Sequence, residues 1–207
     1  MPNIEVEQRG LLTKNKFCQL QSFFAKKAKF LGKKNRFSLI YFQSKKKKAF
    51  QRKENLIDLR LRITNKKTEL VLKYGKCTGR ESRKEFCFEI DSKKFSEMVE
   101  FLHLLGFSYG VIQANVIFVY RYQGIDFSLV EVPSWGYYFE AEILTGTQLV
   151  KKADRKIKEE CAKLNLEIIN ENDFYRLLDD LNNRRGYRFD FDKQSFSEIK
   201  KRFIDFF

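Results

Sequence analysis

Several stretches of this chain alternate between charged and apolar residues, and a period of two is typical of strands that bury one face. The clearest stretch is 57–64, where three aliphatic residues alternate with Arg60 and Arg62. The whole chain contains only two prolines, so little interrupts such strands. The pattern predicts an antiparallel sheet with its apolar face under helices. Its charged face either meets water or closes into a barrel with a polar interior.

Two of the predicted strands carry pairs of glutamates. Glu5 and Glu7 share one face of the strand 3–12 with Arg9, and Glu140 and Glu142 share one face of the strand 137–144. A carboxylate pair at i and i+2 on a rigid strand is a suitable oxygen-ligand set for Mg²⁺ or Mn²⁺. A solvated strand face is the alternative for either pair alone. The repetition of the pattern favours a metal site.

The hydrophobic periodicity predicts helices inserted between eight strands. The predicted strands are 3–12, 36–43, 57–64, 68–74, 83–90, 107–122, 125–132 and 137–144. The predicted helices are 14–30, 92–105, one after Thr147, one from about Asp173, and 195–207, which begins with a capping box. We interpret 182–188 as a basic surface loop and the lysine run 45–48 as a solvated loop, with a polyanion-binding flap as the alternative. The last helix either docks on the body or binds a partner.

The composition limits the function further. With 207 residues and 43% hydrophobic content, the chain can form a sizeable core, and its net charge of +14 favours phosphate-rich small molecules, nucleic acid or an acidic membrane surface. The four cysteines lie far apart without a CxxC pair, so we expect reduced thiols in a cytoplasmic protein and no zinc site. No apolar run approaches the ~20 residues of a membrane span, and we expect no membrane partner.

Five motifs follow one another in an order that resembles a known family. The motifs are Glu5-Val6-Glu7-Gln8-Arg9, Leu59-Arg60-Leu61-Arg62, Lys73, Arg83 with Glu85, and Gly136 to Glu142. The first is similar to the ExExK signature of the CYTH family, also called triphosphate tunnel metalloenzymes, and the others are similar to its later landmarks. The family includes class IV adenylate cyclases, thiamine triphosphatases and inorganic triphosphatases. The resemblance covers about residues 3–180.

The resemblance implies an α+β fold, an eight-stranded closed antiparallel β-barrel whose tunnel holds a triphosphate, with flanking helices. It implies a tunnel domain over residues 1–182 and a C-terminal extension over 183–207 that carries an amphipathic helix. The implied function is that of a metal-dependent triphosphatase or class IV-type adenylate cyclase with Mg²⁺ or Mn²⁺ as cofactor. Tripolyphosphate, ATP or thiamine triphosphate would be the substrate. A homodimer is kept open as the assembly.

The same resemblance assigns roles to individual residues. The implied catalytic residues are Glu5, Glu7, Arg9, Glu140 and Glu142. The implied substrate-binding residues are Arg9, Arg60, Arg62, Lys73, Arg83 and Glu85. The implied metal ligands are Glu5, Glu7, Glu131, Glu140 and Glu142.

The sequence also departs from the family pattern. Arg9 replaces the signature lysine, and Glu131 stands where we expect an aspartate on the seventh strand. The sixth strand lacks the usual Lys-x-Arg pair over 113–117, and the second strand has no counterpart of the tunnel acid. A triphosphate-binding protein with little turnover is therefore one alternative function. A basic nucleic-acid-binding protein is another, although no recognised nucleic-acid motif supports it.

Overall fold

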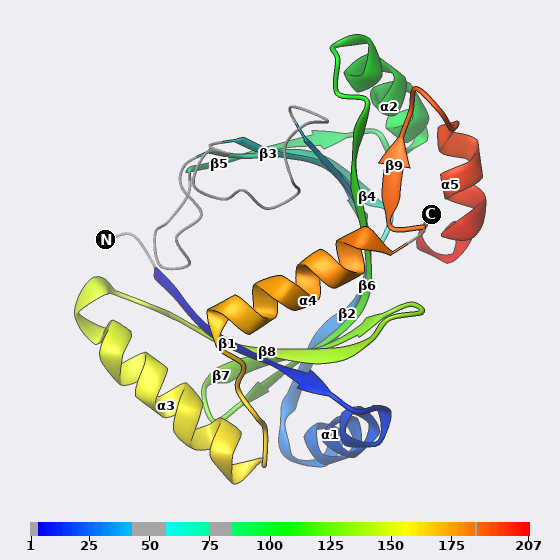
Figure 1. The fold of residues 1–207 in the computed structure, drawn as a ribbon. Coiled ribbons are helices and arrows are strands. Elements are labelled where there is room, and N and C mark those ends of the chain that lie inside the picture. Colours follow the sequence, from blue (N-terminus) through cyan, green and yellow to red (C-terminus); the bar gives the residue numbers. More distant parts are fainter. Residues whose placement is uncertain (1–3, 43–56, 75–83, 185) are drawn as a thin grey trace. The chain divides into compact units, whose positions relative to one another are not determined.

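The structure is a computed structural model, and it describes residues 4–42, 57–74, 84–184 and 186–207 (Figure 1). The chain divides into two compact units. Unit 1 contains residues 1–34 and 115–176, and unit 2 contains residues 35–114 and 177–207. The predicted division at residue 182 stays a prediction.

Three elements contribute to both units, namely β2 (Lys29–Tyr41), β6 (Tyr109–Tyr122) and α4 (Glu171–Asn183). Unit 1 also contains β1 (Ile4–Leu12), α1 (Lys14–Lys27), β7 (Ile125–Val132), β8 (Gly136–Thr145), η2 (Thr147–Leu149) and α3 (Val150–Lys163). Unit 2 also contains β3 (Ile57–Thr64), β4 (Lys67–Tyr74), β5 (Lys84–Ile90), η1 (Ser92–Lys94), α2 (Phe95–Leu104), β9 (Arg188–Asp190), α5 (Phe196–Arg202) and η3 (Ile204–Phe206).

The strands form one hydrogen-bonded sheet in the order β1-β8-β7-β6-β2-β3-β4-β5, and β9 pairs with β6. The predicted antiparallel α+β architecture is confirmed, but the predicted closed barrel is wrong in one respect. Within the described residues, β1 and β5 stand at the two ends of this order and do not pair, so hydrogen bonds do not close the sheet. Alternation specifies that a strand buries one face, and it carries no information on whether the first strand meets the last.

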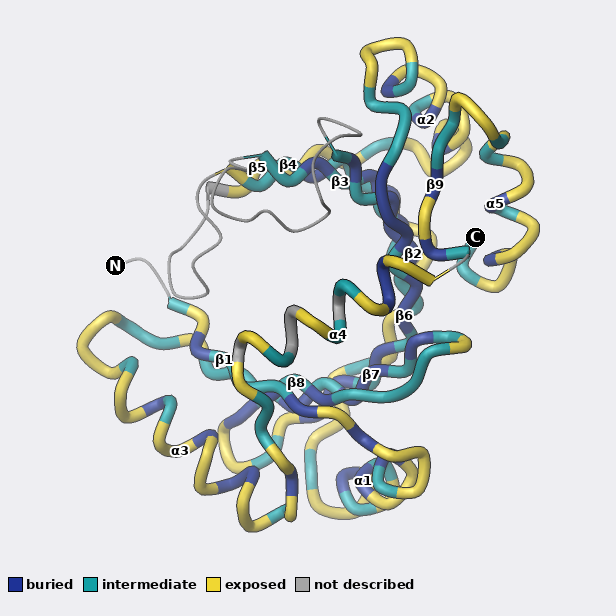
Figure 2. Tube along the Cα trace, viewed as in Figure 1, coloured by how far each residue is buried: buried dark blue, intermediate teal, exposed yellow. Residues whose placement is uncertain are grey.

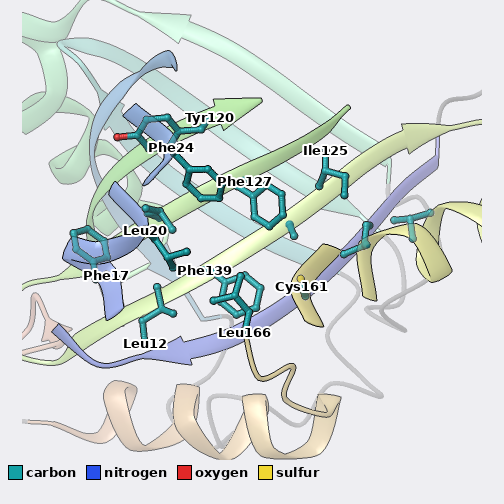
Figure 3. Packing of buried hydrophobic residues seen from close by; sticks show 14 of the residues in the cluster. Leu12, Phe17, Leu20, Phe24, Tyr120, Ile125, Phe127, Phe139, Cys161 and Leu166 are labelled. Carbon is teal, nitrogen blue, oxygen red and sulfur yellow. The ribbon is translucent and has the colours of Figure 1, made fainter. Parts of the chain in front are cut away.

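Unit 1 has a core between its strands and two helices. Phe17, Leu20 and Phe24 of α1 and Ala153, Ile157 and Cys161 of α3 join one buried cluster with residues of β1, β7 and β8 (Figure 3). Phe24 is fully buried, and its ring packs against the rings of Tyr120 and Phe127. The two helices therefore cover the apolar face of these strands. The opposite face of β1 and β8 carries their charged residues.

Unit 2 repeats this arrangement with other elements. Phe37 of β2 is fully buried and contacts the rings of Phe95 in α2 and Phe203 near the C-terminus. Phe196 of α5 stacks on Phe95 with ring centroids 5.3 Å apart, so the C-terminal helix packs on unit 2. The capping box predicted at Ser195 is present. Figure 2 shows buried residues along β2 and β3, and in β3 they alternate with the charged residues Asp58, Arg60 and Arg62.

Several boundaries differ from the predictions, and β2 begins at Lys29 rather than at residue 36. The first helix ends at Lys27 rather than at residue 30, because the backbone of Ala28 is already extended and Phe30 belongs to β2. Ala28 and Leu31 continue the helical spacing by chance, and pairing in the sheet overrides that local signal. The predicted loop 182–188 is shorter in the structure, because α4 extends to Asn183 and β9 begins at Arg188. None of the described helices is long and apolar enough to cross a membrane.

Candidate active site: an acidic strand face and a basic strand face

Five acidic residues of unit 1 gather on one face of three neighbouring strands, β1, β7 and β8. In the antiparallel pair β1 and β8, Glu7 lies opposite Glu142 and Arg9 lies opposite Glu140. Directly opposed residues of antiparallel strands point to the same face, and Glu5 joins them by alternation. The structure thus brings together all five residues predicted to be catalytic. The other face of β1 and β8 belongs to the core.

Arg9 is the base within this acidic face. Its guanidinium donates hydrogen bonds to both carboxylate oxygens of Glu7, from Nε to Oε1 and from Nη2 to Oε2. Its Nε also lies 3.4 Å from Oε1 of Glu140. Burial alone would lower the pKa of Arg9, but the hydrogen bond and charge of Glu7, and then the charge of Glu140, raise it above its ordinary value. Arg9 therefore stays charged and neutralises only part of the acidic face.

The negative charge that Arg9 does not neutralise affects the pKa values of Glu140 and Glu142. Burial raises the pKa of Glu140 to about 7, with Glu7 adding to the effect and Arg9 opposing it. The pKa of Glu142 is also raised to about 7. Burial is the largest cause, and the negative charges of Glu5, Glu7 and Asp126 add to it. Neighbouring carboxylates repel one another when they are ionised, so a cluster of them has a negative potential and binds protons near neutral pH.

This donor set fits a hard divalent cation. Mg²⁺ and Mn²⁺ prefer carboxylate oxygens, and a bound cation would relieve the repulsion that raises both pKa values. Among the described residues, no three side chains of Asp, Glu, His or Cys already converge as a set of metal ligands. Both oxygens of Glu7 are engaged by Arg9, so a cation would have to compete with Arg9 for Glu7.

Glu131, the fifth predicted metal ligand, lies on the other face of the sheet. Its partner across β7 and β8 is Tyr137, whose hydroxyl donates to Glu131 Oε1 at 3.4 Å, and whose ring contacts Phe17 of α1. The acid of β7 on the acidic face is Asp126, which lies opposite Glu142. Residues 126 and 131 differ by an odd number, so their side chains point to opposite faces. Pairing the two strands residue by residue from their connecting turn places Asp126 opposite Glu142, and this register is the sequence signal for Asp126.

A base on the sixth strand was also missed. Residues 113–117 contain none, but Arg121 lies further along β6, directly opposite Asp126. Its Nε and Nη2 donate to the two carboxylate oxygens of Asp126 at 2.6 and 2.7 Å. Because Asp126 lies on the acidic face, Arg121 does too. The sequence signal was present as the pair Arg121 and Asp126 flanking the turn at Gly124.

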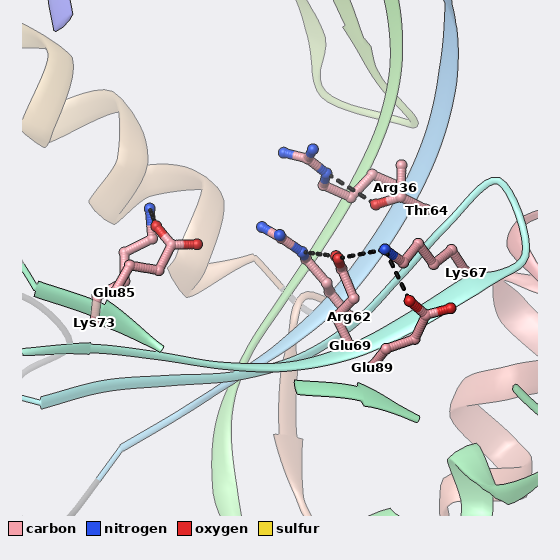
Figure 4. A network of polar contacts seen from close by, with 8 residues as sticks. All are labelled: Arg36, Arg62, Thr64, Lys67, Glu69, Lys73, Glu85 and Glu89. Carbon is pink, nitrogen blue, oxygen red and sulfur yellow. Dashed lines mark hydrogen bonds and ion pairs between the residues drawn. The ribbon is translucent and has the colours of Figure 1, made fainter. Parts of the chain in front are cut away.

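In unit 2, four residues predicted to bind substrate share one face of β3, β4 and β5, namely Arg60, Arg62, Lys73 and Glu85. Figure 4 shows Arg62, Lys73 and Glu85. Arg62 lies opposite Glu69, and Arg62 Nε donates to Glu69 Oε2 at 2.8 Å. Arg60 donates two hydrogen bonds to Asp58, at 2.7 and 2.6 Å. The two arginines point to the same side as predicted. Each already has a carboxylate partner.

The rest of this basic face is paired in the same way. Lys73 Nζ lies 2.9 Å from Oε2 of Glu85, so these two predicted residues contact each other rather than standing apart. Burial is the largest single effect on Glu69 and would raise its pKa, but the hydrogen bond and charge of Arg62, with smaller contributions from Cys87 and Lys67, together outweigh burial and lower that pKa. A phosphate that binds here would therefore exchange with a carboxylate. Arg83, the remaining predicted ligand, lies outside the described residues.

Comparison with known proteins tests the fold. No protein-family profile and no curated protein matches the chain. Among solved structures, a Pyrococcus horikoshii protein has a TM-score of 0.64 at 22% identity, over 87% of this chain and 99% of its own. A proposed adenylate cyclase from Vibrio parahaemolyticus has a TM-score of 0.61 at 12% identity, over 86% and 99%. The chain has the fold of these proteins.

A third similar structure is that of a protein with a described activity. It is a proposed adenylyl cyclase from Hippeastrum, described as having a dominant triphosphatase activity, with a TM-score of 0.55 at 18% identity over 84% of this chain and 95% of its own. The resemblance to the CYTH family predicted from the motifs is thus confirmed at the level of the fold. Fold similarity at this identity does not transfer an activity, so the activity has to be argued from the site.

The raised pKa values predict how pH affects the metal-free protein. The folded state holds protons on Glu140 and Glu142 that the unfolded chain releases above about pH 4.5. The free energy of unfolding should therefore fall as pH rises from about 4.5 to about 7. We expect a loss of about 2 kcal/mol, less than the full shifts would give, because these side chains keep contact with water. Chemical denaturation across this range measures it. The doubly substituted Glu140→Gln, Glu142→Gln protein should lose this part of the pH dependence.

Proposed function

We propose that this protein is a divalent-metal-dependent enzyme acting on a triphosphate-bearing small molecule. The observation that carries the proposal is the acidic face of unit 1, where Glu140 and Glu142 have pKa values raised to about 7. Such a site is costly for a protein that never binds a cation there, since every carboxylate in it repels the others. The fold shared with proposed cyclases and a protein with triphosphatase activity supports the same function.

The proposal assigns the metal to five carboxylates. Mg²⁺ or Mn²⁺ would be held by a subset of Glu5, Glu7, Asp126, Glu140 and Glu142. The bound cation would supply Lewis-acid polarisation of the phosphoryl group and charge neutralisation. Asp126 takes the place that the sequence had suggested for Glu131. The choice of oxygen ligands follows from their common face on β1, β7 and β8.

Arg9 and Arg121 are the bases of the acidic face, and each binds a carboxylate through two nitrogens. A guanidinium matches a phosphate as well as a carboxylate, because both offer two oxygens in one plane. We assign these arginines to orienting the triphosphate, with Arg9 also controlling how far Glu7 is available. The attacking group is water in a triphosphatase and the ribose 3′-hydroxyl in a cyclase.

A substrate panel tests this function. Purified protein is incubated with tripolyphosphate, ATP or thiamine triphosphate and either Mg²⁺ or Mn²⁺, and free phosphate and cyclic AMP are measured separately. We expect turnover of at least one substrate, lost when the metal is chelated. Metal-independent release of phosphate, or no product from any substrate, would contradict the proposal.

A second candidate function is triphosphate binding with little turnover. The observation that favours it is the pairing of Arg60, Arg62 and Lys73 with carboxylates on the same strand face. These bases are placed to exchange one anion for another, which is a binding property rather than a catalytic one. Tight binding of tripolyphosphate without product in the panel would select this candidate. The third alternative, a nucleic-acid binder, predicts a steep loss of RNA or DNA affinity with salt.

The resemblance assigns Arg62 to substrate binding, and we keep that role for Arg62 in both candidate functions that use triphosphate. Substitution Arg62→Ala should weaken tripolyphosphate affinity about ten- to a hundredfold, because a charge-assisted hydrogen bond to phosphate contributes roughly 1.5–3 kcal/mol. Titration calorimetry at fixed salt measures it. Arg155→Ala on the exposed side of α3 removes the same charge and is the matched control. Equal affinities of the two variants would leave Arg62 with a structural role only.

A further inference from the structure

Unit 1 has a second charged region that the proposed site does not use. No aspartate or glutamate occurs between Glu7 and Glu54. Within this acid-free stretch, α1 ends with two exposed lysines, and the first six residues of β2 add three more. We call this surface the basic apolar patch. It consists of Lys26, Lys27, Lys29, Phe30, Leu31, Lys33 and Lys34.

Two apolar side chains stand among these lysines. Phe30 is 52% exposed and Leu31 is 39% exposed. The Phe30 ring packs against Tyr120 on its inner side, with ring centroids 5.2 Å apart, so it is held in place while much of it faces water. Figure 2 shows exposed residues along the outer side of α1. Consecutive strand residues point to opposite faces, so Phe30 and Leu31 expose apolar surface on both sides of this end of β2, and the charged residues of the patch are all lysines. Exposed apolar residues among charges of one sign indicate a binding segment.

We propose that the basic apolar patch binds the surface of a membrane rich in anionic lipids. Lysine ammonium groups are attracted to such a surface without needing a particular arrangement of phosphates, and phenylalanine and leucine enter the boundary between headgroups and acyl chains. The patch offers both kinds of side chain within nine consecutive residues, Lys26 to Lys34. The contact is peripheral. This proposal departs from the expectation of no membrane partner, which rested on the lack of a membrane-spanning apolar run.

The chemistry of the patch favours lipid over nucleic acid. All of its cations are lysines, whereas arginine is the residue that matches phosphate and base edges with two hydrogen bonds. Only Phe30 could stack on a base, and the neighbouring Leu31 has no aromatic face. A diffuse anionic surface needs neither arginine geometry nor a row of aromatic rings. Because exposed charges dominate the attraction, binding should be reversible and sensitive to salt.

Vesicle co-sedimentation of the full chain tests the proposal. The probes are vesicles of phosphatidylcholine alone and vesicles with equal parts of phosphatidylcholine and phosphatidylserine. We expect binding to the anionic vesicles only, lost at high salt. The test variant reverses three charges of the patch, Lys26→Glu, Lys27→Glu and Lys29→Glu. The control variant reverses three exposed charges on α3, Lys151→Glu, Lys152→Glu and Lys156→Glu.

The test variant should bind anionic vesicles about a hundredfold less tightly or worse, and the control variant should stay within about tenfold of wild type. Leu31→Ser should weaken binding without changing the net charge. Hydrolysis of soluble tripolyphosphate should be the same in all these variants. This second measurement therefore distinguishes a failure of the proposed function from a failure of membrane binding. The proposal is overturned if both charge variants bind equally, or if wild type binds single-stranded RNA more tightly than the anionic vesicles.

Discussion

Replacing Glu142 by glutamine is expected to abolish metal-dependent turnover and, at the same time, to stabilise the metal-free protein. Glutamine has nearly the same shape but lacks the charge that a hard cation requires, so we expect kcat/KM to fall about a hundredfold or more at limiting metal. Burial and the charges of Glu5, Glu7 and Asp126 raise the pKa of Glu142, and the variant removes that cost. At pH 8 the gain should be about 1–2 kcal/mol.

The measurement combines steady-state kinetics over a range of Mg²⁺ or Mn²⁺ with denaturation of the metal-free protein at pH 5 and pH 8. The stabilisation should shrink at pH 5, where Glu142 of wild type is protonated as well. Glu131→Gln is the matched control, because it makes the same chemical change on the same sheet but on the face toward α1. Normal turnover of Glu142→Gln at limiting metal, or an equal loss in both variants, would remove Glu142 from the metal site.

The faces of individual strands could be predicted from the sequence, because the direction of a side chain depends only on its position along the strand. Arg60 and Arg62 share a face for this reason, and so do Glu140 and Glu142. The partners of those side chains could not be predicted in the same way. That Arg62 faces Glu69, and that Glu7 faces Glu142, depends on the register between strands, which is set by turns and by distant parts of the chain.

The error at Glu131 shows what register adds. The family pattern predicts an aspartate on the seventh strand, and Glu131 is the acid nearest to that place in the sequence, but it lies on the face toward α1. The structure pairs Asp126 with both Glu142 and Arg121, so one residue links β7 to its two neighbours on the acidic face. Neither link is visible from the periodicity of β7 alone. The first helix was predicted too long for a related reason, since the sheet rather than local propensity decides where it ends.

Substitution Gly10→Ala is expected to destabilise the protein strongly. A Cβ added at Gly10 would lie 1.9 Å from the carbonyl oxygen of Glu167 and 2.5 Å from the ring of Phe139. Next to this contact, the amide of Ile169 donates to the carbonyl of Arg9 at 2.9 Å, so the segment after α3 is held directly against β1. Backbone cannot move aside as a flexible side chain can, and we expect a loss of about 3 kcal/mol or more in the free energy of unfolding.

Gly146→Ala provides the matched comparison for this prediction. Gly146 also lies in unit 1, has a φ of −78°, and has no atom within 4 Å of an added Cβ, so alanine should leave stability unchanged or raise it slightly. Thermal denaturation should separate the two variants by about 5 °C or more for a chain of this size. Since Gly10 follows Arg9 on β1, any shift of the strand that relieves the clash also displaces Arg9 and Glu7. We therefore expect Gly10→Ala to lower metal-dependent turnover even at temperatures where it is folded. A variant as stable and as active as Gly146→Ala would show that β1 and the segment after α3 are not in close contact.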